Sequence, residues 1–137
     1  MYLLDTNVVS ELRRPKPHGA VVAWVKSVPE QQLLLSAVTM GEIQAGIELT
    51  REQDPAKTQA LEQWADQLGD SHQVLPMDAA TIRIWARLMH RRSDTLYEDA
   101  MIAATAQRHS LTVVTRNVAD FIPFGVAIFN PFDGAPA

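Results

Sequence analysis

The sequence predicts an α/β fold in which helices cover both faces of a mostly parallel central sheet. Two observations support this prediction. Short apolar runs of strand length alternate along the chain with longer segments of helical character. The helical segments begin at residues that favour helix caps, and prolines end two of them. Strands that alternate with helices are typical of parallel sheets covered on both sides.

Five apolar runs are predicted to be strands. The run around Leu33-Leu34-Leu35 reads as a buried strand, and Leu111–Val114 is the strongest strand signal in the chain. In chain order the five are Tyr2–Leu4, Gln32–Ser36, Val74–Leu75, Leu111–Val114 and Val126–Phe129.

Six helices fill the intervals between these strands. Thr6 or Asn7 can cap the first, and Pro15 and Pro17 end it. Asp54-Pro55 combines a cap with a first-turn proline and opens the fourth. The expected helices cover residues 6–12, 21–28, 39–49, 55 to about 68, 78 to about 91 and 95 to about 109.

The composition indicates one soluble globular domain over residues 1–137, with 47% hydrophobic and 20% charged residues. Cysteine is absent, which excludes disulfides, thiolate zinc sites and cysteine nucleophiles. No run approaches membrane-spanning length, and the apolar start is too short for a signal peptide. We therefore expect a cytoplasmic protein without membrane contact.

The net charge of −4 argues against broad electrostatic coating of nucleic acid. Two local basic clusters are compatible with a rim that binds a phosphodiester, or with solvated faces. They are Arg13, Arg14 and Lys16, and Arg87, Arg91 and Arg92.

Four acidic residues stand where a carboxylate is costly: Asp5, Glu42, Asp99 and Asp120. Each follows an apolar strand or lies on the apolar face of a predicted helix. Ligand sites in parallel sheets lie beyond the carboxyl ends of the strands, where Asp5 and Asp120 fall. Two carboxylates about 4 Å apart repel by roughly 4 kcal/mol at an effective dielectric of about 20. A hard cation such as Mg²⁺ is the usual means of neutralising such a group.

Asp5 and Glu42 each have a structural alternative. Asp5 could cap the first helix, although Thr6 or Asn7 could do so instead. Glu42 and Thr39 fit a capping box, but Glu42 also shares a helical face that we expect to point inward. The other members of that face are Val38, Ala45, Gly46 and Leu49.

Asp99 opens a helix that is apolar on nearly every side and is expected to be buried. Its neighbour Glu98 fits a capping box with Thr95, so we assign Glu98 the structural role and Asp99 the functional one. Asp120 lies in a predicted loop past the strongest strand, where aspartate is often a turn former. Asn117 in the same loop is its rival or helper.

Other candidate residues are weaker. Asp78 is most simply a helix cap, and the histidines lack metal-binding spacing. The tryptophans lie at helical spacing with aliphatic residues and suit a core or an interface. Neither a glycine-rich phosphate loop nor a Gly-x-Ser-x-Gly elbow occurs.

Four motifs in order resemble the PIN-domain family over nearly the whole chain. Leu4–Ser10 is similar to the start of that family, the helix with Glu42 to its second acidic motif, and Asp99–Ala106 to its third. Thr115–Phe121 resembles the fourth, and the ending Val126–Phe132 resembles the FitB-like branch of VapC toxins.

This resemblance implies a three-layer α/β/α sandwich and a Mg²⁺-dependent, or Mn²⁺-dependent, ribonuclease. Such a protein would be the toxin half of a toxin–antitoxin pair. It would be a homodimer inhibited by a small VapB-like antitoxin whose tail blocks the acidic pocket, and it would meet DNA only through that antitoxin. Asp5, Glu42 and Asp99 match the three core acids, and either Asp120 or Asn117 the fourth. Asn7 and Thr115 would be supporting polar groups.

The expected reaction is hydrolysis of an RNA phosphodiester by metal-activated water. Asp5 and Asp99 would hold the main cation with Asp120 beside them. Glu42 would bind a second cation or orient the attacking water. The RNA sequence, the choice between Mg²⁺ and Mn²⁺ and the number of ions stay open.

Two other functions are compatible with the sequence. The protein could act mainly as a catalytically weak half of a DNA-bound repressor complex, in which a partner supplies the DNA-contacting surface. A phosphate-handling enzyme such as a phosphatase would favour Asp-x-Asp after the first strand, where this chain has Asp5-Thr6-Asn7.

Overall fold

In the computed structural model, which describes residues 1–133, five strands form one parallel sheet in the order β3-β2-β1-β4-β5. Tyr2 of the central strand pairs with Leu33 on one side and Thr112 on the other. The predicted strands are confirmed, with three of them shorter than expected. Their bounds are β1 Tyr2–Leu4, β2 Leu33–Ser36, β3 Val74–Leu75, β4 Thr112–Val114 and β5 Ile128–Phe129.

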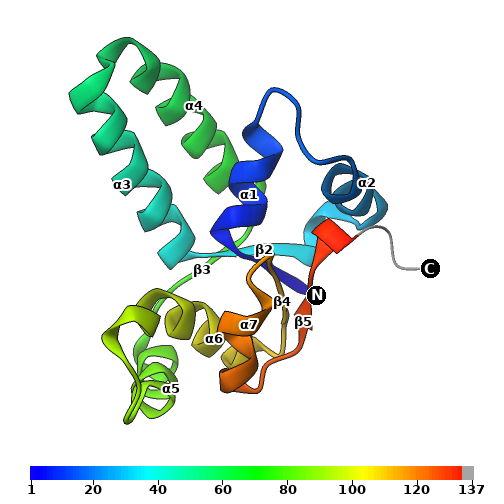
Figure 1. The fold of residues 1–137 in the computed structure, drawn as a ribbon, viewed down its shortest axis with the longest axis vertical. Helices are drawn as coiled ribbons and strands as arrows, with labels where there is room; N and C mark the ends of the chain where they lie inside the picture. Colours follow the sequence, from blue (N-terminus) through cyan, green and yellow to red (C-terminus); the bar gives the residue numbers. More distant parts are fainter. Residues whose placement is uncertain (134–137) are drawn as a thin grey trace.

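Helices cover both faces of this sheet, as Figure 1 shows, with α1 to α4 on one side and α5 to α7 on the other. They are α1 Thr6–Arg13, α2 Gly19–Ser27, α3 Ala37–Gln53, α4 Pro55–Ser71, α5 Ala79–Met89, α6 Tyr97–His109 and α7 Val118–Phe121. Short 3-10 turns are η1 Glu30–Gln32, η2 Asp94–Leu96, η3 Ile122–Phe124 and η4 Pro131–Asp133. The six predicted helices are present. The four-residue helix α7 was not predicted, because one turn is too short to show a helical period.

Two apolar cores follow from the alternation of side chains along the strands. Leu3 and Leu34 face one core, which they share with the buried side chains of α6. Leu4, Leu33 and Leu35 face the other, which α1, α2 and α3 complete. Helix α6 is buried on most sides, as predicted, because it packs against both the sheet and α5.

Two predicted helix caps were wrong, and a capping box that was an alternative role for Glu42 does not form. Asp5, and neither Thr6 nor Asn7, caps α1, since its carboxylate accepts from the Thr6 amide at 2.8 Å. Ser36 caps α3, so Thr39 and Glu42 form no capping box. Helix α6 begins at Tyr97 without a side-chain cap, so Thr95 and Glu98 form none either. A capping pattern read from sequence fixes a helix start only when the first turn falls where expected. Asp78 does cap α5, as expected.

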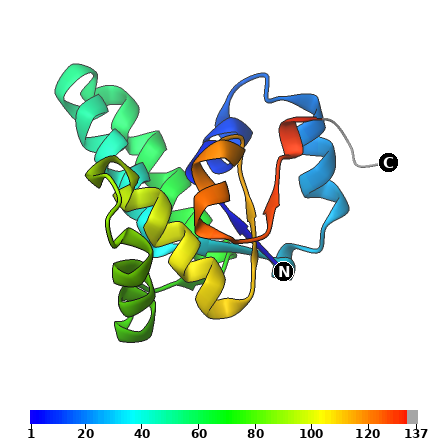
Figure 2. The ribbon, with the colours of Figure 1, turned by 60° about the horizontal axis from the view of Figure 1, so that its bottom comes forward.

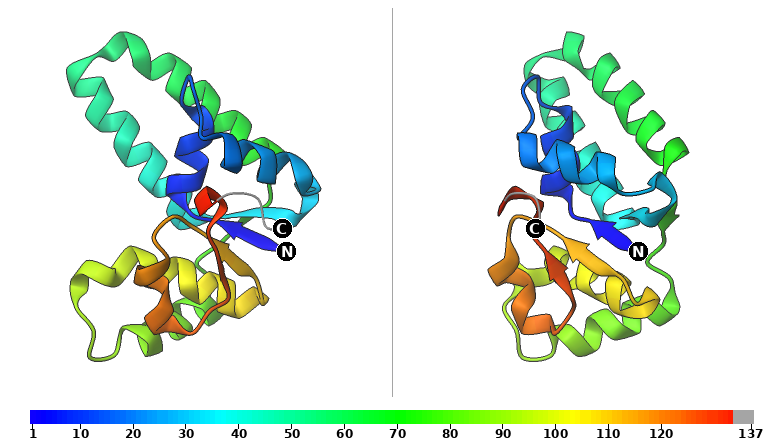
Figure 3. Two further views of the ribbon diagram at one scale, coloured as in Figure 1. Left: turned by 45° about the vertical axis from the view of Figure 1, so that its right-hand side comes forward. Right: turned by 90° about the vertical axis from the view of Figure 1, so that its right-hand side faces the viewer.

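The expected inward face of α3 was also wrong. Ala45, Gly46 and Leu49 are exposed, and the buried residues of this helix are Thr39, Ile43 and Ile47. Helices α3 and α4 form a hairpin that projects beyond the sheet (Figures 1 and 3), so only one narrow strip of α3 meets the core. Within the described residues, no helix has the length and apolar character needed to cross a membrane.

Candidate active site

The strand order places a crevice between β1 and β4. From β1 the chain passes through β2 and β3 on one side, then returns to add β4 and β5 on the other. Open α/β sheets bind ligands at such a switch point, beyond the carboxyl ends of the strands. Asp5 directly follows β1, and Thr115 directly follows β4. The Asp5 amide donates to the carbonyl of Val114 at 2.9 Å, which fixes both residues at this edge.

Asp5 is buried, with 5% of its surface exposed, and three donors hold its carboxylate. Its Oδ1 accepts from the Thr6 amide at 2.8 Å. Its Oδ2 accepts from the Thr115 hydroxyl at 2.8 Å and from Asn7 Nδ2 at 3.1 Å. Burial raises the pKa of Asp5, these hydrogen bonds oppose the rise, and the charge of Asp120 adds to it. The three donors therefore orient the Asp5 carboxylate, and none of them supplies a positive charge.

Glu42 reaches the site from α3. The Thr6 hydroxyl donates to Glu42 Oε1 at 2.9 Å and contacts the buried Thr39 hydroxyl at 3.1 Å. Burial raises the pKa of Glu42 to about 7, against the hydrogen bond from Thr6, and Glu98 and Asp5 raise it further. Helix α1 thus links the carboxylate after β1 to the one on α3 through a single threonine.

Asp99 and Asp120 complete the group from the other side of the crevice. Asp99 is half-buried in the first turn of α6, and burial raises its pKa to about 6, followed by the charges of Asp5, Asp120 and Glu98. Asp120 is exposed in α7, whereas the sequence predicted a loop there. Its charge acts on both Asp5 and Asp99. Asp5 is therefore the common neighbour of the other three predicted acids, since it is electrostatically coupled to Glu42, Asp99 and Asp120.

Glu98 is a fifth acid that sequence reasoning missed, because it was assigned to a cap. In the structure Glu98 lies close enough to Glu42 for its charge to raise the pKa of Glu42. The signal that could have found it is its position beside Asp99, in the first turn of the helix that supplies the third acid.

The loop after β4 supplies the polar support that the sequence suggested. The Thr115 hydroxyl, which donates to Asp5, accepts from the Asn117 amide at 3.0 Å and from Asn7 Nδ2 at 3.2 Å. Asn7 Oδ1 in turn accepts from the Arg116 amide at 3.1 Å. This network ties α1 to the β4–α7 loop across the crevice.

The four acids form no ion pair in the part of the chain that the structure describes. None of the ion pairs formed within residues 1–133 includes Asp5, Glu42, Asp99 or Asp120. Carboxylate oxygens without a cation of the chain's own are the donor set that a hard divalent cation prefers. In the same described range, however, no three carboxylate or imidazole side chains lie close enough to enclose an ion by themselves.

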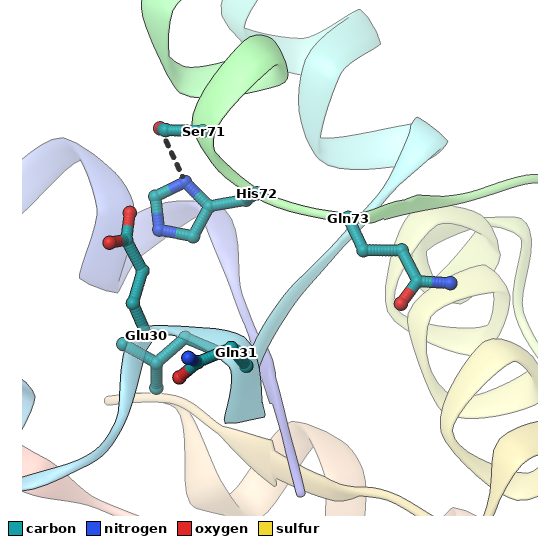
Figure 4. A pocket seen from close by; sticks show the side chains of 6 residues that line it. Glu30, Gln31, Ser71, His72 and Gln73 are labelled. Atoms are coloured by element: carbon teal, nitrogen blue, oxygen red, sulfur yellow. Dashed lines mark hydrogen bonds between the residues drawn. The ribbon is translucent and has the colours of Figure 1, made fainter.

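A second hollow, of about 340 Å³, lies at the opposite edge of the sheet (Figure 4). It stands at the amino ends of β2 and β3, lined by side chains that include Glu30, Ser71 and His72. His72 Nδ1 lies 3.0 Å from the Ser71 hydroxyl and 3.1 Å from the Leu68 carbonyl, so this nitrogen serves the end of α4. The hollow therefore lies at the end of the sheet away from the crevice, where parallel sheets do not place their ligand sites.

The family model for the PIN domain matches residues 2–121, which include all four acids. The chain belongs to the PIN-domain family. Toxin FitB of Neisseria gonorrhoeae is 38% identical to it over 138 residues, which cover 96% of this chain and 99% of that protein. VapC ribonuclease Y4jK of Sinorhizobium fredii is 34% identical, with 98% of this chain and all of that protein covered.

Solved structures of PIN-domain proteins match the fold equally well. The crystal structure of FitAcB from Neisseria gonorrhoeae superposes with a TM-score of 0.86 at 37% identity, over 96% of this chain and 99% of that one. The structure of FitAB bound to an IR36 DNA fragment gives 0.79 at 37% identity, over 96% of each chain. The three-layer PIN-like architecture that the sequence predicts is thus confirmed.

Proposed function

We propose that this PIN-domain chain is a metal-dependent ribonuclease and the toxin of a type II, VapBC-like toxin–antitoxin pair. The observation that carries the proposal is that Asp5, at the switch point of the sheet, is electrostatically coupled to Glu42, Asp99 and Asp120, while none of the four forms an ion pair within residues 1–133. The similarity to Toxin FitB and to a VapC ribonuclease supports RNA as the substrate class.

Asp5 and Asp99 would hold the main ion, Mg²⁺ or alternatively Mn²⁺, with Asp120 beside them. Glu42 would bind a second ion, directly or through water, or orient the attacking water. An ion bound there would polarise the phosphoryl oxygen and lower the pKa of bound water. Because no three of these side chains enclose an ion by themselves, water would fill much of its coordination shell, as is common for Mg²⁺.

The hydrogen bonds around Asp5 suit this role. A carboxylate offers about four acceptor positions, and three are taken by Thr6, Asn7 and Thr115. The remaining position is on Oδ1, which accepts one hydrogen bond and can face a cation. Thr115 and Asn7 would act as positioning residues that hold Asp5 for this task.

For the fourth acid we favour Asp120 over Asn117. The charge of Asp120 acts on Asp5 and Asp99, whereas the amide of Asn117 supports the Thr115 hydroxyl. We therefore assign Asn117 a supporting role beside Asn7 and Thr115.

The test uses Asp99→Asn, because no hydrogen bond to the Asp99 side chain would be lost within residues 1–133. Asp5→Asn is less clean, since an amide at position 5 would face the Asn7 donor. We expect Asp99→Asn to lower cleavage of total RNA at least about 1000-fold, the loss of about 4 kcal/mol of transition-state stabilisation. The measurement is cleavage by antitoxin-free protein in Mg²⁺, Mn²⁺ or EDTA.

Asp66→Asn is the matched control, because Asp66 is exposed on α4 outside the carboxylate group. It removes the same charge and should cleave as the unchanged protein does. Loss of folding in Asp99→Asn, seen by circular dichroism, would assign Asp99 a structural role. Full activity in a folded Asp99→Asn protein would exclude it from the chemistry.

The alternative function is that of a catalytically weak partner in a DNA-binding repressor complex. It draws support from the similar FitAB protein, whose structure was solved with a DNA fragment, and from the net charge of −4, which suits a partner that supplies the DNA surface. A VapB-like antitoxin, a homodimer and DNA contact only through the antitoxin belong to both proposals. Growth arrest on expression without the antitoxin is expected from the nuclease alone.

A further inference from the structure

A basic cleft of about 530 Å³ opens beside the crevice. It is lined by the end of α1 and the loop that follows, and by the β4–α7 loop. We call it the basic cleft. Its lining residues are Glu11, Arg14, Pro15, Lys16, His18 and Arg116. Three cations face one carboxylate here, in a chain whose net charge is −4. The cleft is therefore a local positive region in an acidic protein.

Arg116 is held in the cleft without being neutralised. Its guanidinium lies over the ring of Phe132, 4.2 Å from the ring centre, and Phe132 meets His18 edge-on at 5.4 Å. Phe132 belongs to η4, which packs against α2 (Figures 2 and 3). Stacking on an aromatic ring orients a guanidinium and leaves its in-plane donors free. Within residues 1–133, neither Arg116 nor Lys16 takes part in an ion pair.

Glu11 connects the end of α1 to the loop that follows it. It is buried, and its carboxylate accepts from the His18 amide at 3.0 Å and from Arg14 Nη1 at 3.2 Å. The bond from the His18 amide holds the pKa of Glu11 below its usual range, with smaller contributions from Arg14 and Arg116. The loop between these residues contains Pro15 and Pro17, which restrict its backbone. Glu11 and the two prolines thus restrict the backbone that carries Arg14 and Lys16.

One side chain separates the cleft from the carboxylate site. The Arg116 amide donates to Asn7 Oδ1 at 3.1 Å, and Asn7 Nδ2 donates to Asp5 Oδ2 at 3.1 Å. A strand that presents one phosphodiester to Asp5 can therefore place a nearby phosphate among Arg14, Lys16 and Arg116.

The second basic cluster that the sequence offered is arranged differently. Arg92 donates to the carbonyls of Leu88 and Pro123 and lies over the Phe124 ring, so its guanidinium fastens the α5–α6 loop to η3. Its donors are engaged with the protein, whereas those of Arg116 and Lys16 face the cleft.

We propose that the basic cleft binds a backbone phosphate of the RNA strand next to the phosphodiester that is cut. This inference rests on the proposed function and adds the direction in which the substrate strand leaves the carboxylates, over the β4–α7 loop toward α2. Arg116 and Lys16 would contact the phosphate, and Glu11 would limit the affinity through its negative charge.

The experiment measures binding of a fluorescently labelled single-stranded RNA to Asp99→Asn protein by anisotropy, at several salt concentrations. Addition of Lys16→Gln and Arg116→Gln should weaken binding about tenfold and reduce the slope of log K against log salt by about 0.7, the value for one phosphate on a single strand. Arg83→Gln with Arg108→Gln, exposed residues of α5 and α6 that belong to neither basic cluster, is the control and should change neither value by as much.

Two further variants separate an effect on RNA binding from an effect on folding. Lys16 is exposed, and its side chain forms no ion pair or hydrogen bond within residues 1–133, so Lys16→Gln alone should weaken binding about threefold without loss of structure. Glu11→Gln keeps an oxygen that accepts from the His18 amide but removes the charge, and should strengthen binding about threefold. A gain of affinity is not expected from a residue that merely maintains the fold.

Equal binding by the cleft variants and the control pair, with RNA still cut by the unchanged protein, would overturn the cleft proposal and leave the nuclease intact. Failure of the unchanged protein both to bind and to cut RNA would overturn both proposals. Polyglutamate that competes as well as unlabelled RNA would assign the cleft to an acidic protein segment and overturn it as an RNA site.

Discussion

Glu42 and Glu48 lie on the same helix, and their carboxyl groups respond in opposite ways to their surroundings. Burial, together with Glu98 and Asp5, raises the pKa of Glu42 to about 7. Hydrogen bonds from Arg51 and Gln44 hold the pKa of Glu48 below its usual range. Glu48 sits on the projecting part of α3, where Arg51 also binds Glu62 at 2.7 Å, while Glu42 sits at the crevice and forms no ion pair within residues 1–133.

The difference teaches which acidic residues are costly for the fold. An exposed carboxylate with an arginine partner stabilises its helix slightly, and nothing further is needed to explain it. A half-buried carboxylate beside two others destabilises the folded chain, and such a residue is a candidate for function. The same comparison separates Asp78, a cap with a lowered pKa, from Asp5, a cap with a raised one.

The largest expected effect comes from removing the carboxylate charge of Glu42 and, separately, that of Glu48, because this tests directly whether the two residues differ. Glu42→Gln should lower RNA cleavage about 100-fold, while Glu48→Gln should leave it within about twofold, because only Glu42 faces the crevice. Metal-free stability should move the other way: Glu42→Gln raises it, and Glu48→Gln lowers it slightly. RNA cleavage and urea unfolding of both variants provide the measurement. Equal effects of the two variants on cleavage would contradict a special role for Glu42.

Thr115 tests whether orientation of the acids matters as well as their charge. Thr115→Val removes the hydroxyl that donates to Asp5 and leaves the Asn117 amide without its acceptor. We expect cleavage to fall about tenfold to 100-fold and stability to fall by about 1–3 kcal/mol. Thr115→Ser keeps the hydroxyl and should restore most of the activity. If serine were as inactive as valine, the hydrogen bond to Asp5 would be unimportant for catalysis.

The raised pKa values predict how stability depends on pH. Between pH 5 and pH 7.5 the folded chain holds protons on Asp99, with a pKa of about 6, and on Glu42, with a pKa of about 7, that the unfolded chain has already released. The free energy of unfolding without metal should therefore fall as pH rises through this window. Urea unfolding at both pH values measures it, and Asp99→Asn with Glu42→Gln should flatten the profile.

Added Mg²⁺ sharpens the same test. If the ion binds the ionised carboxylates, it should stabilise the protein more at pH 7.5 than at pH 5, because binding competes with protons. Stabilisation of equal size at both pH values would place the ion elsewhere on the protein.

The smallest effect is expected at Arg51, which forms the surface ion pairs of α3. Arg51→Gln removes ion pairs to Glu48 and Glu62, all of them on the surface. We expect a loss of less than about 1 kcal/mol and no change in RNA cleavage. Measurement of both quantities beside Glu42→Gln would complete the comparison, and a large loss of cleavage would show that the hairpin communicates with the crevice.

Much of the architecture was predictable because it depends on local patterns. Apolar runs set the five strands, and the residues that follow β1 and β4 could be placed at one edge of the sheet without knowing any contact. That residues 1–137 form a single domain, and that the protein is cytoplasmic, stay predictions. The local errors concerned where helices begin and which face is buried. The first turn of α6 was misplaced, which gave Glu98 a wrong capping role, and the wrong face of α3 was expected to be buried.

The sequence by itself determined the fold class and the order of the elements, since both follow from periodicity and from the residues that end each segment. It also pointed to four acids, whose role in the site stays a prediction. Only the tertiary structure decided which neighbours those acids have. It brought Thr6 to Glu42, Glu98 to the same carboxyl group, and Arg116 onto Phe132 beside Asn7. These contacts join residues far apart in the chain, and their geometry depends on how whole helices pack, which no local spacing encodes.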